Sequence, residues 1–135
     1  MEKVTGIGGF FFRAKDPKAL GLWYQQHLGI LVIPTSPEES SWQQEAGPTA
    51  FTAFKESTDY FGDPKKVWML NFRVRDLDKM AAQLQAGGIE VKMDPESYPY
   101  GRFARCMTLR EIRLNCGNLQ SQPLHASLLN NQDCF

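Results

Sequence analysis

Two stretches of the chain share a pattern in which an apolar, strand-like run leads into an amphipathic helix. The first contains Phe12-Arg13-Ala14-Lys15-Asp16, and the second, 60 residues later, contains Phe72-Arg73-Val74-Arg75-Asp76. In each copy the aspartate is followed by apolar residues at helical spacing, and the run ends at a glycine. The pattern therefore predicts an internal repeat of a strand followed by a helix.

Local signals mark the beginning and the end of each predicted helix. Asp16 and Asp76 suit N-cap positions, because an aspartate side chain accepts a hydrogen bond from a backbone N–H of the first turn, and Pro17 suits the first helical position. Gly29 and the pair Gly87-Gly88 end the two helices. The residues at helical spacing in the first helix are Leu20, Trp23, Tyr24, His27 and Leu28. In the second helix the expected buried stripe is Leu77, Met80, Ala81 and Leu84.

Short strands are predicted around both helices. The first set is Gly6–Lys15, Ile30–Ile33 and Thr49–Lys55, and the second is a strand beginning at Trp68, then Ile89–Met93 and Gly101–Arg105. A strand, a helix and then several strands, twice over, favour the α+β class over a doubly wound parallel sheet. We therefore expect a first module at 1–58, a linker at 59–66 and a second module at 67–105.

The charge balance excludes some function classes. The 135 residues contain 15 Lys+Arg and 15 Asp+Glu, so the formal net charge is zero. Without a basic excess there is no electrostatic basis for binding nucleic acid or an anionic membrane surface. The apolar stretch Gly6–Phe12 is far shorter than the roughly 20 residues that span a bilayer, and it has no signal-peptide flanks. We expect a cytoplasmic protein.

The last 30 residues differ in composition from the rest. Cys106, Cys116 and Cys134 all lie there, and four of the five asparagines do as well. The cysteines show neither a disulfide framework nor the ligand spacing of a zinc site. The last 30 residues are therefore considered separately from the rest of the chain.

The body of the chain, about residues 4 to 105, resembles the vicinal oxygen chelate superfamily, which includes glyoxalase I, bleomycin-resistance proteins and extradiol dioxygenases. The resemblance is carried by FFFRAKDPKALGLWYQQHLGI, by its repeat LNFRVRDLDKMAAQLQAGGIEV and by DPESYPYGRFAR. It implies two βαβββ modules whose strands form a curved, cup-shaped mixed sheet. It also implies a ligand in the cup and a homodimer.

The superfamily's final strand phrase is missing from its expected place. It resembles LHDPEGNPIELWEP, whereas this chain reads CMTLREIRLNCGNL. A permitted choice of codons from Cys106 onward, read two bases later, encodes HDPEGNPIELWEP. We infer a one-base deletion after Arg105, so that 106–135 is an out-of-frame tail and the last strand is replaced or lost. The alternation of Ile112, Leu114 and Cys116 with polar residues allows replacement, and disorder is expected beyond Gly117.

The resemblance also implies where a metal would be bound. Metal-dependent members place His, Gln or Glu seven residues before each capping aspartate, and these positions are Gly9 and Met69 here. A glutamate on a later strand of the first module is replaced by Thr52 or Ala53, and the fourth position is lost with the frame. Because a divalent ion of this type needs N or O donors, the prediction is no metal and no other cofactor. The alternative, a misplaced register on Thr49–Lys55, leaves a divalent metal open.

Candidate ligand residues follow from strand alternation and from the predicted rim of the cup. Arg13 and its repeat mate Arg73 suit a small anion, with Phe11 and Asn71 on the same faces, although both arginines also suit ordinary ion pairs. Aromatic walls and a third cation complete the set. The remaining candidates are Trp68, Tyr98 and Arg102.

These observations predict a metal-free binding module that sequesters a small aromatic or anionic compound, as the resemblance to bleomycin-resistance proteins implies. No catalytic residue is assigned, because neither module pairs a histidine with a serine or cysteine, and His27 suits a surface role at a helix end. One alternative is a metal-dependent lyase or isomerase of the glyoxalase I type. Another is an inactive frameshifted copy.

Overall fold

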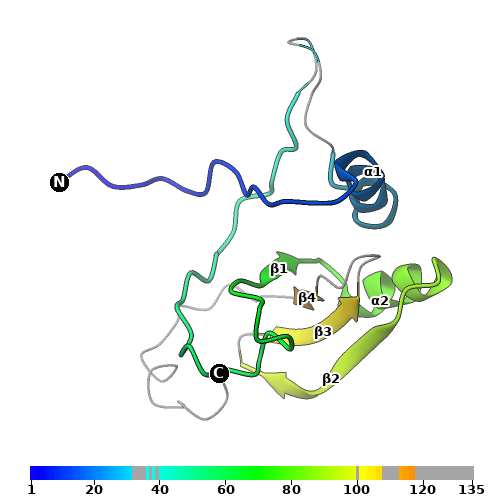
Figure 1. Cartoon of the computed structure of the whole chain (residues 1–135). Helices are drawn as coiled ribbons and strands as arrows, with labels where there is room; N and C mark the ends of the chain where they lie inside the picture. Colours follow the sequence, from blue (N-terminus) through cyan, green and yellow to red (C-terminus); the bar gives the residue numbers. More distant parts are fainter. Residues whose placement is uncertain (32–35, 37, 39, 100, 108–112, 118–135) are drawn as a thin grey trace. The chain divides into compact units, whose positions relative to one another are not determined.

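The protein is represented by a computed structural model that describes residues 1–31, 36, 38, 40–99, 101–107 and 113–117 (Figure 1). The chain divides into two compact units, Met1–Gln43 and Gln44–Phe135. The repeat boundaries at 58 and 66 are a feature of the sequence and stay a prediction. No helix among the described residues is long and apolar enough to cross a membrane.

The first unit contains the helix α1, Pro17–Leu28, as the sequence predicts. The Asp16 side chain accepts a hydrogen bond from the Ala19 N–H at 3.0 Å, which satisfies one of the donors that a helix start leaves open. At the other end, Gly29 adopts a left-handed backbone conformation with φ 68°, which any other residue would adopt only with strain. The helix buries Leu20, Trp23 and Tyr24.

Two strands expected in the first module are not present. The segments 6–15 and 49–55, both described, take part in no strand pairing, and Ile30–Ile33 lies partly outside the described residues. Phe11 and Phe51 are 83% and 91% exposed. An alternating or apolar run becomes a strand only when a neighbouring backbone satisfies its N–H and C=O groups, and within the described residues these segments have no such neighbour.

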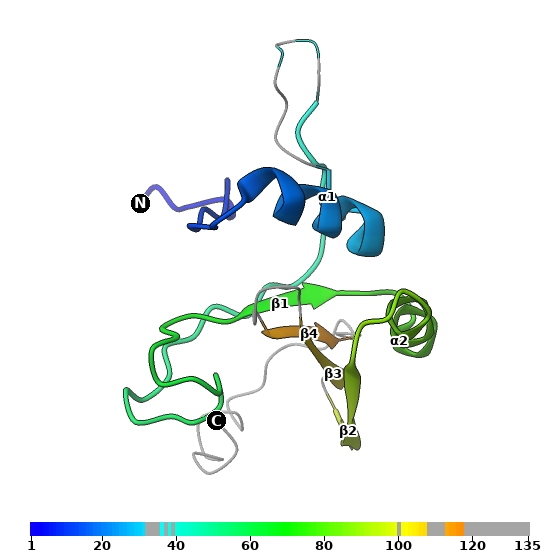
Figure 2. The ribbon, with the colours of Figure 1, turned by 45° about the vertical axis from the view of Figure 1, so that its right-hand side comes forward.

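The second unit is one βαβββ arrangement. Its elements are β1 (Leu70–Arg73), α2 (Leu77–Ala86), β2 (Val91–Tyr98), β3 (Gly101–Met107) and β4 (Arg113–Gly117). The sheet order is β1-β4-β3-β2, with β1 and β4 parallel and the other two pairs antiparallel. The expected α+β class is therefore confirmed in its mixture of helix and strand. In Figure 2, α2 lies on one side of this sheet.

The core of the second unit lies between α2 and the sheet. Asp76 caps α2 by accepting from the Lys79 N–H at 3.0 Å, and the helix ends at Gly87. Buried apolar side chains come from α2, from the segment after it and from β3. They are Leu77, Ala81, Leu84, Ile89, Ala104 and Cys106.

The central strand β4 comes from the segment with the unusual composition. Arg113–Gly117 pairs with β1 on one side and with β3 on the other, so this segment provides the fourth strand of the sheet. The deletion inferred from the codons stays a prediction. The disorder expected beyond Gly117 falls on residues 118–135, which lie outside the described part of the chain.

Candidate functional site

Strand pairing assigns each side chain of the sheet to one of two faces. Ala104 and Cys106 are each 2% exposed and lie on the face that α2 covers. Phe103 and Arg105 alternate with them and therefore lie on the other face, which we call the distal face. Paired residues share a face, so the register brings further β1 and β2 residues onto it. The distal face comprises Asn71, Arg73, Lys92, Tyr98, Phe103 and Arg105.

Arg105 is the half-buried cation near the middle of the distal face. Its guanidinium carbon lies 4.1 Å from the centroid of the Tyr60 ring, a cation–π distance. Its Nη1 also donates to the Tyr60 carbonyl oxygen, at 3.4 Å. This contact fixes the plane of the guanidinium and engages one of its five N–H donors, which leaves a preorganised fork for a carboxylate.

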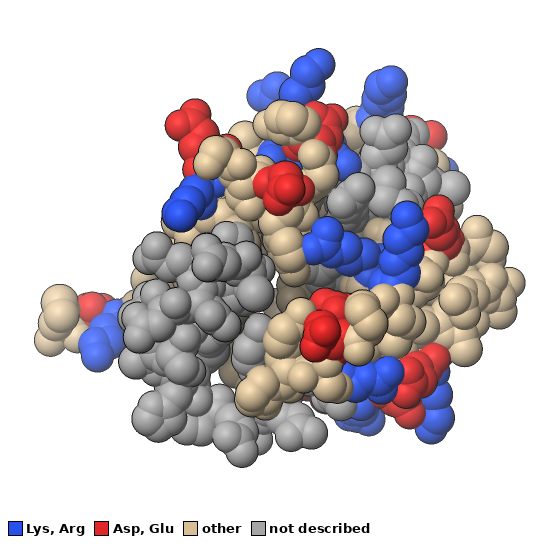
Figure 3. All heavy atoms as spheres, turned by 90° about the horizontal axis from the view of Figure 1, so that it is seen from below, with Lys and Arg blue, Asp and Glu red and all other residues tan. Residues whose placement is uncertain are grey.

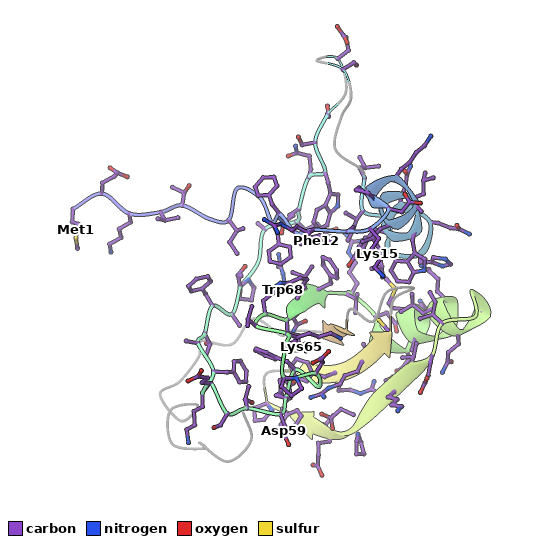
Figure 4. The ribbon with its side chains drawn as sticks, in the orientation of Figure 1. Met1, Phe12, Lys15, Asp59, Lys65 and Trp68 are labelled. Carbon is purple, nitrogen blue, oxygen red and sulfur yellow. The ribbon has the colours of Figure 1, made fainter. Side chains whose placement is uncertain are left out.

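Aromatic rings flank Arg105 from two directions. Tyr60 stacks on Phe54, with ring centroids 5.5 Å apart and an interplanar angle of 9°. On the sheet itself, Tyr98 and Phe103 make an edge contact at 5.9 Å. The Tyr60 loop precedes β1, and Figure 4 labels Asp59 and Lys65 on it. The distal face therefore combines a held cation with apolar ring surface, the composition that suits a small aromatic anion.

Arg73 is held by a segment that crosses the end of β1. Its Nη2 donates to the Glu45 carbonyl oxygen at 2.8 Å, and the Glu45 carboxylate forms an ion pair with Arg75. The guanidinium lies so close to Gly47 that a Cβ at that position would collide with it. Arg73 is therefore positioned on the distal face, with part of its hydrogen-bonding capacity already used.

Lys92 and Asp94 add one charge of each sign to the β2 side of the distal face. Lys92 pairs in register with Arg105, and its Nζ lies 3.3 Å from the Glu90 carboxylate. The half-buried Asp94 carboxylate accepts from the Tyr98 hydroxyl at 3.3 Å, which places Asp94 on the distal face although the ladder is irregular there. Lys92 is thus a second cation directly beside Arg105, while the Asp94 carboxylate lies two residues further along β2.

Arg102, which the sequence analysis assigned to the ligand, lies on the opposite face. It forms a two-point ion pair with Asp78 of α2, with N–O distances of 2.9 and 3.0 Å. The hydrogen bond from Arg102 holds the pKa of Asp78 below its ordinary value, and the pKa of Arg102 is raised by the same bond. This pair joins β3 to the first turn of α2.

The other predicted residues divide between the two units. Asn71, Arg73 and Tyr98 share the distal face, although Tyr98 ends strand β2 instead of lying in the predicted rim loop. Trp68 precedes β1 and is 37% exposed (Figure 4). Phe11 and Arg13 belong to the first unit, where both side chains are exposed.

Sequence reasoning missed Arg105, Lys92, Asp94, Phe103 and Tyr60. The alternation along β3 was visible, but each of its faces carries one arginine, so the pattern alone does not say which of Arg102 and Arg105 faces α2. The small residues Ala104 and Cys106 were the usable signal, because small side chains suit close contact with a helix. Tyr60 had no local signal, since its partner Arg105 is 45 residues away.

The residues present do not supply the donor set of a metal-dependent relative. Met69 offers a thioether and Gly9 offers no side-chain donor, and neither is a good ligand for a divalent ion that prefers nitrogen or oxygen. Within the part of the chain that the structure describes, no group of three or more His, Cys, Asp or Glu side chains is placed to hold a metal ion.

Charge on the described surface is mixed. In the view of Figure 3, basic and acidic side chains lie among uncharged ones, in keeping with the equal numbers of the two kinds in the sequence. The cations of the distal face are therefore a local feature of the sheet, not part of a generally basic surface.

Comparison with known protein families places the chain in a superfamily. The profile of the Glyoxalase/Bleomycin resistance protein/Dioxygenase superfamily matches residues 6–111, which is most of the chain. Comparisons with curated proteins and with solved structures found no match. The match includes both copies of the repeated phrase and most of the sheet. The chain therefore belongs to the glyoxalase/bleomycin-resistance/dioxygenase superfamily.

Proposed function

We propose that the protein binds a small aromatic anion on the distal face of the second unit without requiring a metal ion, as a resistance or sequestration module does. The observation that carries the proposal is the Arg105 guanidinium, fixed against Tyr60 at 4.1 Å, paired in register with Lys92 and sharing its face of the sheet with the Tyr98–Phe103 pair. A guanidinium whose geometry is fixed in advance binds a carboxylate at a lower entropic cost than a mobile one.

Two arginines on one strand provide a matched test. Arg105→Gln removes the charge from the distal face, whereas Arg102→Gln removes an equal charge from the face that α2 covers. With benzoate as the probe, we expect Arg105→Gln to weaken binding about tenfold or more, because a hydrogen-bonded charge contributes roughly 1.5–3 kcal/mol. Arg102→Gln is expected to bind benzoate within about twofold of the original chain. Calorimetric titration measures both, and equal losses in the two variants would contradict the proposal.

Metal dependence is tested on the same complex. After dialysis against a chelator, the protein is expected to keep both its affinity for benzoate and its thermal midpoint. If chelation abolishes binding and a divalent ion restores it, the metal-dependent lyase or isomerase is the better assignment.

The homodimer expected of the superfamily is part of the proposal. Phe11, Phe51 and Val67 are large apolar side chains that the described structure leaves exposed, and they are available for contact with a second copy. Analytical ultracentrifugation should give twice the mass of the chain, and a monomer at tens of micromolar would contradict this part.

A further inference from the structure

The distal face also carries a fixed negative charge, the Asp94 carboxylate, in addition to the positive charge of Arg105. Asp94 is half-buried, and its Oδ1 accepts from the Glu96 N–H at 2.9 Å while its Oδ2 accepts from the Tyr98 hydroxyl at 3.3 Å. These two bonds fix the carboxylate on the sheet. A carboxylate offers about four acceptor positions, so two fixed bonds leave capacity for a ligand's donor.

The strand register gives the approximate distance between Asp94 and Arg105. Lys92 pairs directly with Arg105, and Asp94 follows Lys92 by two residues along β2. Two residues of a strand span roughly 7 Å, and neighbouring strands lie about 5 Å apart. Asp94 and Arg105 are therefore separated by about the length of a small aromatic ligand. The rings of Phe103 and Tyr98 lie on the same face of the sheet and contact each other.

We propose that the Asp94–Tyr98 pair selects, among the aromatic anions of the proposed function, those that carry an amino group or other hydrogen-bond donor at the end remote from the carboxylate. This inference rests on the proposed function. The ligand's carboxylate meets Arg105, its ring lies against Phe103 and Tyr98, and its donor meets Asp94. The preferred ligand is thus a zwitterion, such as an aminoalkyl-substituted aromatic acid, and simple aromatic acids bind more weakly.

Two probes of similar size separate the parts of this proposal. 4-(Aminomethyl)benzoate carries an ammonium group, and 4-ethylbenzoate places a methyl group at the same position. Because a hydrogen bond between two charged groups is stronger than an apolar contact at the same position, the ammonium compound is expected to bind about tenfold more tightly to the unaltered chain. Calorimetric titration at pH 7 measures the ratio of the two dissociation constants.

The variant Asp94→Asn removes the charge and keeps acceptor oxygen for the Glu96 N–H. We expect it to lower the preference for 4-(aminomethyl)benzoate to about twofold or less, with the affinity for 4-ethylbenzoate nearly unchanged. Asp63→Asn, in the loop before β1, is the control, since its side chain can still accept from the Lys65 N–H. This control is expected to keep the tenfold preference.

The outcomes distinguish failure of the proposed aromatic-anion binding from failure of the proposed selection by Asp94. If neither compound binds the unaltered chain, the proposed function fails. If both bind equally, or if Asp94→Asn keeps the preference, the binding face stands and the selection by Asp94 is wrong. Loss of binding of both compounds in Asp94→Asn, in a variant with an unchanged thermal midpoint, would also overturn the selection, because Asp94 would then act on the aromatic acid itself.

Discussion

The two copies of the repeated phrase have the same structure at their aspartates and different structures at their phenylalanines. Asp16 and Asp76 each accept a backbone N–H at 3.0 Å and start a helix. Phe72 lies in strand β1, paired with β4, whereas Phe12 lies in a segment that pairs with no strand of the described chain. The helix start depends on contacts within four residues, while the strand depends on a partner more than 40 residues away.

This difference indicates which copy of the repeated phrase can hold side chains in fixed positions for a ligand. A strand that is paired on a sheet holds its side chains at fixed positions on a fixed face, as Asn71 and Arg73 are held. The equivalent Phe11 and Arg13 are exposed on an extended segment. The second copy thus provides the preorganised surface on which the proposed function depends.

Removing β4 should have the strongest effect on the second unit. A chain that ends at Met107 lacks Arg113–Gly117, the strand that joins β1 to β3. Both neighbours then lose a ladder of hydrogen bonds, and at roughly 1 kcal/mol for each bond this loss is comparable with the roughly 5–15 kcal/mol by which small domains are stable. Urea unfolding followed by circular dichroism should show no cooperative transition for the second unit.

A chain that ends at Gly117 is the control for this truncation. It keeps β4 and both of its strand pairings, so we expect it to retain the transition of the full chain. A chain ending at Met107 that unfolds at the same midpoint would show that the tail strand does not contribute to the fold.

The helix caps should behave alike in the two copies. Asp16→Ala and Asp76→Ala each remove one capping hydrogen bond of the same length. Each substitution is expected to lower the helix stability of its own unit by about 1 kcal/mol, within a range of roughly 0.5–2. Amide hydrogen exchange of α1 and α2 measures the two effects separately. A cap whose loss changes exchange in only one copy would contradict the local origin of the helix starts.

The Arg102–Asp78 pair should give a small, pH-dependent contribution to the second unit. Because Arg102 lowers the folded-state pKa of Asp78 below its ordinary 3.8, the stabilisation is complete above that value and is lost as the pH falls through the lower folded-state pKa. Asp78→Asn should therefore be less stable than the original chain at pH 7, and this difference in stability should be smaller near pH 2. Thermal unfolding at both pH values tests this, and a pH-independent difference would assign the effect to something other than the carboxylate charge.

The parts of the structure that depend on local sequence were predictable. Both helices, their caps and their ends follow from Asp16, Asp76, Gly29 and Gly87, because these signals act within one or two turns. The faces of β1 were predictable as well, since alternation alone separates Asn71 and Arg73 from Leu70 and Phe72.

What sequence could not supply was pairing between distant segments. The strand at Gly6–Lys15 was predicted from the same pattern that correctly predicted β1, an apolar run that leads into a capping aspartate, but such a run does not provide a partner strand. The candidate site was affected in the same way. Arg102 and Arg105 are equivalent in sequence pattern, and only the packing of Ala104 and Cys106 against α2 separates them.

The central claim is that the distal face of the second unit binds small aromatic anions by itself. An amide NMR titration of the isotope-labelled full chain with 4-(aminomethyl)benzoate tests it directly. The account predicts that shifts concentrate on the distal-face residues and on the Tyr60 loop, and that they disappear in Arg105→Gln. Shifts concentrated in α2, or in residues 6–15, would contradict the claim by placing the ligand away from this face.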